Sequence, residues 1–116
     1  MGDEERVVDA FAAYLEALGL TVHREVAFCD LVARRDREIR YVEAKGRTSA
    51  RGLDVDTLYG QLLRRMPETN DPTARWIVGV PTEMIPHALR VPSRIRQTLR
   101  IDVYEVDADG RISGPR

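Results

Sequence analysis

The sequence predicts a single α/β domain in which helices flank both faces of a mixed β-sheet. Helical and strand-like segments interleave after an initial run of strands, which is the pattern of such folds. A short apolar segment, "RWIVGV", is typical of a strand buried in the middle of a sheet. A chain of 116 residues can build one core but not two. We expect one domain over residues 1–110 and a flexible tail at 111–116.

The first half of the chain predicts one helix and three strands. The helix is expected to begin at Asp3, a suitable cap, and to end at Gly19, with apolar residues at helical spacing between them. Three strands are expected next, at residues 20–26, 27–34 and 39–46. A tight hairpin at residues 35–38 would join the second of these strands to the third.

The second half predicts a helix, a buried strand, two short helices and a final strand. Asp54 is the expected cap of the helix, which would end before Pro67. The apolar strand at residues 75–80 follows, and prolines divide the next stretch into two short helices. A strand at residues 101–107 completes the expected order, α-β-β-β-α-β-α-β.

Composition limits the class of protein. Hydrophobic residues make up 43% of the chain and charged residues 32%, as in ordinary globular domains. No apolar run approaches the roughly 20 residues of a membrane span, so no membrane partner is expected. The acidic start is not a secretory signal. The single cysteine, Cys29, cannot form an internal disulfide, and we therefore expect a cytoplasmic protein.

The predicted hairpin brings two acidic side chains together. If its turn centres between Asp36 and Arg37, then Asp30 lies opposite Glu43, and Lys45 follows on the same face as Glu43. Like charges at opposite positions destabilise a sheet. A cation between the two carboxylates would remove this cost, and Mg²⁺, which prefers hard oxygen ligands, is the natural candidate.

Lys45 is the only lysine among the 18 basic residues of the chain. An ammonium group is a compact charge whose pKa shifts when it is partly buried, whereas guanidinium stays protonated and suits a wide planar partner. A site that must orient or deprotonate a water, or hold one phosphate oxygen, favours lysine. The position of Lys45 beside the acid pair therefore indicates a chemical role.

These residues resemble the motif of the PD-(D/E)xK nuclease superfamily, which has the restriction-endonuclease-like fold. The matching segments are "FCD" at residues 28–30 and "VEAK" at residues 42–45. The expected α-β-β-β-α-β order is similar to the core of that superfamily and covers nearly the whole chain. The small size is similar to that of Holliday-junction resolvases and stand-alone nuclease-like domains. Cys29 stands where the family name has proline.

The resemblance implies a metal-dependent nuclease that hydrolyses phosphodiester bonds, of DNA rather than RNA. Asp30, Glu43 and the backbone carbonyl of Ala44 would hold one or two Mg²⁺ or Mn²⁺ ions. The metal would polarise the scissile phosphate and lower the pKa of the attacking water. Lys45 would position that water or offset charge in the transition state.

Two further residues match the family. A glutamate on the first helix often completes the metal site, and Glu5 is the best match, with Glu4 as the second. Many members carry a glutamine on the helix after the motif strand, and Gln61 matches it. Each has another interpretation, because the helix dipole favours acids in a first turn and Gln61 could simply flank the buried stripe of its helix.

A run of arginines without acids lies between residues 85 and 100, and Arg47 follows the motif strand. The arginines of the run are Arg90, Arg94, Arg96 and Arg100. We expect these side chains and Arg47 to contact nucleic-acid phosphates, and a solvated face is the alternative. Because one small domain offers little surface, a homodimer or a partner protein is also expected.

Two alternatives to the nuclease stay open. The residues Asp30, Glu43 and Lys45 could form a salt-bridge cluster on an exposed sheet face. The whole domain could be a catalytically inactive module that keeps the fold and binds nucleic acid or a protein. An intact set of the three residues favours the enzyme, because binding alone does not require two acids to face each other.

Overall fold

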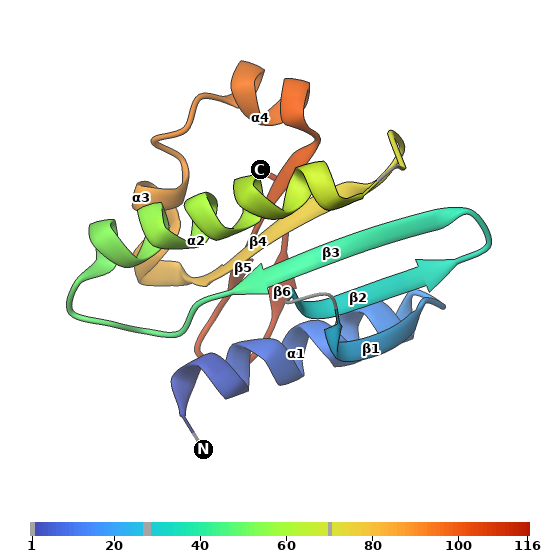
Figure 1. Ribbon diagram of the computed structural model, residues 1–116. Coiled ribbons are helices and arrows are strands. Elements are labelled where there is room, and N and C mark those ends of the chain that lie inside the picture. The colour runs from blue at the N-terminus through green and yellow to red at the C-terminus, as the bar shows by residue number, and fades with distance from the viewer. Residues whose placement is uncertain (1, 27–28, 70) are drawn as a thin grey trace.

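The protein is built in three layers, with a β-sheet between helices (Figure 1). The computed structural model describes residues 2–26, 29–69 and 71–116, and only the backbone of residues 25, 26 and 29. The helices are α1 (Asp3–Ala17), α2 (Arg51–Arg65), α3 (Ile85–Ala88) and α4 (Ser93–Leu99). The strands are β1 (Thr21–Val26), β2 (Cys29–Arg35), β3 (Glu38–Ala44), β4 (Arg75–Pro81), β5 (Ile101–Val106) and β6 (Ile112–Ser113). The predicted α/β class and the α-β-β-β-α-β order are confirmed.

The described strands form one mixed sheet in the order β1-β2-β3-β4-β5-β6. Strands β1, β2 and β3 are antiparallel, while β3, β4 and β5 run parallel. Helix α2 is the crossover between the parallel strands β3 and β4, as such a connection requires. Within the described residues, none of the helices combines the length and the apolar character that crossing a membrane would need.

The predicted register of the β2–β3 hairpin is confirmed. Leu31 pairs with Val42 at one end of the ladder, and Arg35 pairs with Glu38 next to the turn. Asp36, in the turn, has a φ of 53°. Short hairpin turns need such positive φ values, and aspartate tolerates them better than most residues. The turn chemistry therefore sets the pairing of the two strands that carry the motif.

Helix α1 packs on one face of the sheet through a stripe of buried residues. Val7, Phe11 and Leu15 are fully buried and belong to a cluster that includes residues of β2, β3, β4 and β5. The Phe11 ring meets the Tyr104 ring edge to face, with centroids 5.8 Å apart. A Cβ at Gly79 would lie 2.3 Å from the Phe11 ring, so glycine on β4 makes room for this helix.

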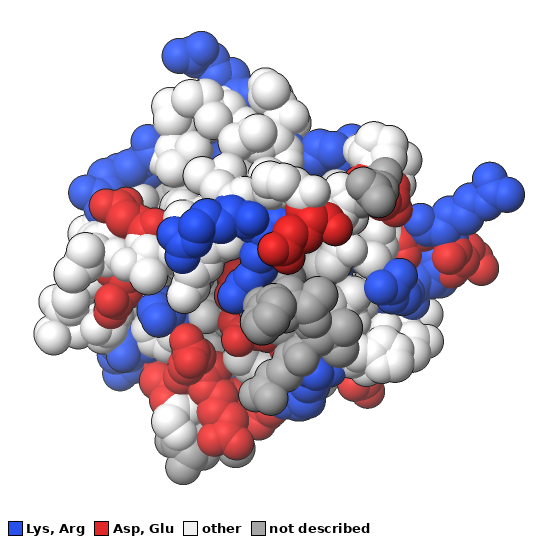
Figure 2. Space-filling model, viewed as in Figure 1, with Lys and Arg blue, Asp and Glu red and all other residues white. Residues whose placement is uncertain are grey.

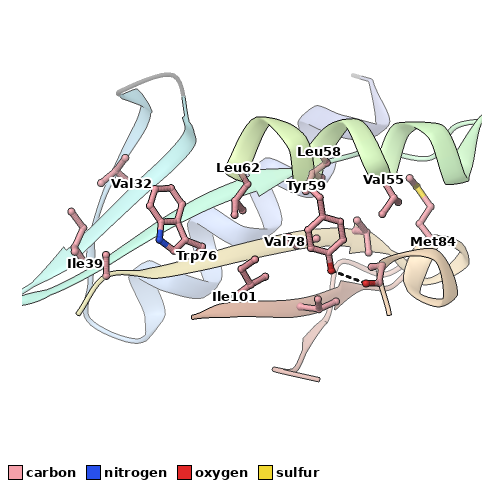
Figure 3. Close-up of a cluster of buried hydrophobic side chains, with 14 residues drawn as sticks. Val32, Ile39, Val55, Leu58, Tyr59, Leu62, Trp76, Val78, Met84 and Ile101 are labelled. Carbon is pink, nitrogen blue, oxygen red and sulfur yellow. Dashed lines mark hydrogen bonds between the residues drawn. The ribbon is translucent and has the colours of Figure 1, made fainter. Parts of the chain in front are cut away.

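Helices α2 and α3 cover the opposite face through a second cluster (Figure 3). Leu58 and Leu62 of α2 pack there with Trp76, Val78 and other buried residues of the sheet. Tyr59 is 6% exposed, and its hydroxyl donates a 2.6 Å hydrogen bond to the carbonyl of Ala88 in α3, drawn as the dashed line in Figure 3. This bond ties α3 to α2.

The Tyr59 hydroxyl makes stability fall at high pH. Burial raises the pKa of Tyr59 from 10.0 to about 12. Because the folded pKa is higher than the unfolded one, this contribution is complete below pH 10 and is lost as the pH rises through 12. We expect Tyr59→Phe to lose less stability than the parent between pH 9 and pH 11.5, as measured by urea denaturation. Equal losses of stability in Tyr59→Phe and in the parent over this pH range would show that the Tyr59 hydroxyl does not cause the fall.

Two segments differ from the expectations. Helix α2 begins at Arg51, so Asp54 lies in its first turn, where its N–H donates a 2.9 Å hydrogen bond to the carbonyl of Ala50. Residues 111–116, expected to be a flexible tail, lie along the edge of the sheet. There β6 pairs with β5, and the N–H of Arg116 donates to the carbonyl of Val103. The unpaired backbone groups of the β5 edge account for this placement.

Candidate functional site

The hairpin places Asp30 beside the end of the motif strand. The paired residues of the β2–β3 ladder end at Leu31 and Val42, and Asp30 and Glu43 are the next residues of the two strands. The Asp30 side chain is half-buried, and its Oδ2 accepts a 2.8 Å hydrogen bond from the N–H of Ala44. The carboxylate is thereby anchored across the ladder to β3. Phe28, the first residue of the matching "FCD" segment, lies outside the described residues.

Glu43 is a buried acid with a basic partner. It is 4% exposed, and its Oε1 is ion-paired with Nη1 of Arg65, in the last turn of α2. A buried charge requires such a partner, because the loss of hydration is costly. Arg65 was not among the site residues predicted from the sequence. The one signal for it was its position four residues after Gln61, which puts both side chains on the same side of α2.

Lys45 lies just past β3 and next to the first turn of α1. Its N–H donates a 3.0 Å hydrogen bond to the carbonyl of Gly79, which extends the pairing with β4. Its side chain is 30% exposed, and Nζ lies 3.8 Å from Oε1 of Glu4. The structure therefore places Glu4, the second choice from the sequence, nearest to the lysine.

Acidic side chains of α1 share a pocket with Asp30. The pocket is open, has a volume of about 270 Å³ and is lined by Glu4, Glu5, Val8, Arg24 and Asp30. Glu5 is exposed, and Arg24 is ion-paired with Asp9. Figure 2 shows acidic side chains gathered at the end of the molecule where α1 begins. Glu5 and Asp30 thus open to one space.

A close backbone contact holds α1 against the end of β3. A Cβ at Gly46 would lie 2.2 Å from the backbone nitrogen of Glu4 and 2.6 Å from the carbonyl carbon of Asp3. The N–H of Arg47 also donates a hydrogen bond to the Asp3 carboxylate. A hydrogen bond from Arg6, together with that from Arg47, lowers the pKa of Asp3. Glycine at position 46 is therefore what lets Glu4 approach Lys45.

We expect Gly46→Ala to destabilise the fold by about 1–3 kcal/mol, because backbone atoms of α1 must move to admit the methyl group. Urea denaturation measures the effect. Gly60→Ala is a matched control, since its Cβ would meet only the Arg64 side chain, at 3.5 Å. That substitution lies within α2 and should stabilise the protein by up to about 1 kcal/mol. Equal urea midpoints of unfolding for Gly46→Ala and the parent would contradict the close contact between Gly46 and the backbone of α1.

Gln61 occupies the α2 side of the site. It is half-buried and lies one turn before Arg65, between the buried residues Leu58 and Leu62. The side chains of Gln61 and Arg65, the partner of Glu43, therefore project from the same face of α2. This position is compatible with a role at the site and equally with the flanking role that the sequence left open.

The predicted metal ligands suit a divalent ion in their chemistry. Asp30, Glu43, Glu5 and the Ala44 carbonyl all offer hard oxygen atoms, which Mg²⁺ and Mn²⁺ prefer. The described side chains do not form a group of three or more metal-binding residues. Asp30 opens to the pocket with Glu5, whereas Glu43 is turned to Arg65. Glu43 is not among the residues that line this pocket, and it would have to leave Arg65 to share a metal ion with Asp30.

The arginine run does not form a single basic strip. Arg96 is 6% exposed and donates to the carbonyls of Val91 and Arg116, while Arg100 donates to those of Thr73 and Ala74 at 3.0 Å. These two guanidinium groups satisfy backbone carbonyls that loop ends leave unpaired. Arg90, Arg94 and Arg47 are exposed. In Figure 2 basic and acidic side chains alternate over the visible face.

The fold is shared with two solved structures of cyanobacterial proteins. An XisH family protein from Nostoc punctiforme PCC 73102 has a TM-score of 0.67 and 17% identity, over 94% of this chain and 97% of that chain. An fdxN element excision controlling factor protein from Anabaena variabilis has a TM-score of 0.64 and 15% identity, over 95% and 97%. No protein-family model matches the chain, and no curated protein matches it significantly. At these identities the likeness shows a common fold.

Proposed function

We propose that this protein is a metal-dependent nuclease of the PD-(D/E)xK type that hydrolyses phosphodiester bonds of DNA. The observation that carries the proposal is the β2–β3 hairpin, in which the Asp30 carboxylate accepts a hydrogen bond from Ala44, the residue between Glu43 and Lys45. The pocket that Asp30 shares with Glu4 and Glu5 of α1 supports it. A salt-bridge cluster on an exposed face is a poorer account, because Glu43 is 4% exposed.

Each residue has a defined task in this proposal. Bound Mg²⁺ or Mn²⁺ would supply a Lewis acid that polarises the phosphate and lowers the pKa of a water. Asp30, Glu43 and the Ala44 carbonyl would hold the ion, and Glu5 would complete the set from α1. Lys45 would donate a hydrogen bond from Nζ to the attacking water or to a phosphate oxygen. Gln61 stays a predicted site residue on α2.

Two observations support DNA as the substrate. The Anabaena neighbour is named for control of the excision of the fdxN element, a name that fits action on DNA. Arg47, directly past the motif strand, is exposed, and Arg90 and Arg94 are exposed beyond α3. Arg90 and Arg94 can contact backbone phosphates, which contribute a large share of the affinity of such interfaces. The Arg47 guanidinium is ion-paired with Glu83, 3.5 Å away, and would have to leave it to do the same. A second copy or a partner protein would enlarge this limited surface.

A second candidate function is favoured by one specific observation. The ion pair of Glu43 with Arg65 already balances the buried acid without a metal. A domain that had lost catalysis could keep this pair for stability and bind nucleic acid or a protein through the same fold. The two candidates differ in whether divalent ions bind at Glu43.

Cleavage of a substrate panel tests the proposal. Labelled DNA and RNA as duplex ends, flaps, four-way junctions and single strands are incubated with Mg²⁺ or Mn²⁺. We expect cleavage of at least one DNA structure, its loss with a chelator, and its loss in Lys45→Ala. Binding without cleavage, unchanged by Lys45→Ala, would favour the inactive module instead.

A further inference from the structure

Glu43 and Arg65 form an ion pair between the end of β3 and the end of α2. The Glu43 side chain is 6% exposed and that of Arg65 is 20% exposed. Removing one partner from a buried pair leaves an uncompensated charge, which is strongly unfavourable. A charged Glu43 at this buried position is therefore stable only with a cation beside it.

Other basic side chains near the motif are engaged elsewhere. Lys45 faces Glu4, and Arg40 is paired with Glu38. Arg75, on the neighbouring strand, makes a bidentate pair with Asp102. Among the described residues, Arg65 is the cation that the fold supplies to Glu43.

A divalent ion and a guanidinium on the same buried carboxylate repel each other strongly, because low-dielectric surroundings screen their charges poorly. Arg65 is able to leave: it lies in the last turn of α2, is partly exposed and has a long flexible side chain. Glu43, in contrast, is held within the sheet. Movement of the arginine is the available response to an ion.

We propose, on the basis of the proposed function, that Arg65 is the internal competitor of the catalytic metal. It is the counterion of Glu43 in the metal-free protein and gives up the carboxylate when Mg²⁺ or Mn²⁺ binds. The freed guanidinium then lies beside the site, with donors suited to a phosphate oxygen of the substrate. Arg65 is in this sense a positioning residue, because it sets the state of Glu43.

The competition has a thermodynamic consequence. Metal binding must break the Glu43–Arg65 ion pair, so the pair lowers the affinity for metal by a certain factor. Bound metal must weaken the ion pair by that same factor, because the coupling is reciprocal. Removing the guanidinium removes the competitor and should tighten metal binding. An ordinary structural arginine would have the opposite effect or none.

Binding of Mn²⁺, followed by calorimetry and by electron paramagnetic resonance without substrate, tests the competition. We expect Arg65→Gln to bind Mn²⁺ about tenfold more tightly than the parent, within the usual range of coupling between sites. Arg64→Gln removes the adjacent exposed arginine and should bind like the parent. Adding Glu43→Gln to Arg65→Gln should abolish the gain.

A second measurement needs no substitution at Arg65 and covers the case in which Arg65→Gln does not fold. The Nε–H resonance of Arg65 in the parent is followed by NMR during a titration with Mg²⁺. We expect this resonance to shift toward the position of exposed arginines and to exchange faster with solvent.

The outcomes separate the two proposals. Suppose that Glu43→Gln weakens Mn²⁺ binding, but the Arg65 resonance does not move and Arg65→Gln binds Mn²⁺ no more tightly than the parent. The proposal that Arg65 competes with the metal is then wrong, and the nuclease proposal stands. If neither the parent nor Arg65→Gln binds Mn²⁺, the nuclease proposal falls and the competition falls with it.

Discussion

Lys45→Arg is expected to lower the rate of DNA cleavage by about 10²–10³-fold, with folding and Mn²⁺ binding close to those of the parent. The change keeps the positive charge, so the charge balance at the acidic end of the sheet is retained. Arginine cannot present a single compact donor, however, and cannot release a proton near neutral pH. Its planar fork would also favour a bidentate pair with Glu4, whose Oε1 lies 3.8 Å from Nζ of Lys45.

Single-turnover cleavage measures this effect, and thermal unfolding and Mn²⁺ binding verify that the variant is intact. Arg37→Lys, at an exposed position in the β2–β3 turn, is a matched control that should retain most of the activity. A Lys45→Arg protein that cuts at the parent rate would show that charge alone is required. The role of the lysine in orienting water or phosphate would then be wrong.

Arg65→Met is expected to reduce the free energy of unfolding by about 3–5 kcal/mol in the absence of metal, because Glu43 stays buried without a counterion. The double variant Glu43→Gln, Arg65→Met removes both charges and should recover a large part of this loss. Urea denaturation of the parent, the two single variants and the double variant gives the coupling energy of the pair. Chelator in every sample keeps metal from stabilising Arg65→Met.

Arg64→Met is the matched control for this cycle, since Arg64 precedes Arg65 on α2 and is exposed. Its effect should stay within about 0.5 kcal/mol. If the effects of Glu43→Gln and Arg65→Met simply add in the double variant, the two side chains are not energetically coupled. Such a result would also remove the structural basis for competition between Arg65 and a metal ion.

The β2–β3 hairpin shows how far local patterns predict this fold. Residue alternation and the turn at Asp36 predicted the pairing of Leu31 with Val42, which the structure confirms. Strand pairing in a tight hairpin depends on a few neighbouring residues, so the sequence contains the necessary information. The start of α2 was less predictable: the sequence pattern predicts a start at Asp54 as the capping residue, but the helix begins at Arg51 without a side-chain cap.

The arginines show where local patterns fail. Arg90, Arg94, Arg96 and Arg100 look alike in the sequence, yet Arg96 and Arg100 hold backbone carbonyls while the other two are exposed. The carbonyls of Thr73 and Ala74, which Arg100 binds, come from a loop more than twenty residues away. Which guanidinium groups remain for a phosphate depends on how these loops pack, and composition does not encode it.

By itself the sequence determined the α-β-β-β-α-β order and the hairpin register from Leu31–Val42 to Arg35–Glu38, because periodicity and turn chemistry act over a few residues. Only the tertiary structure decided the surroundings of these acids. Glu43 meets Arg65, 22 positions along the chain, because Leu58 and Leu62 orient α2 on the sheet. Lys45 meets Glu4 because Gly46 admits the start of α1. Contacts between distant segments follow from core packing, which no local pattern specifies.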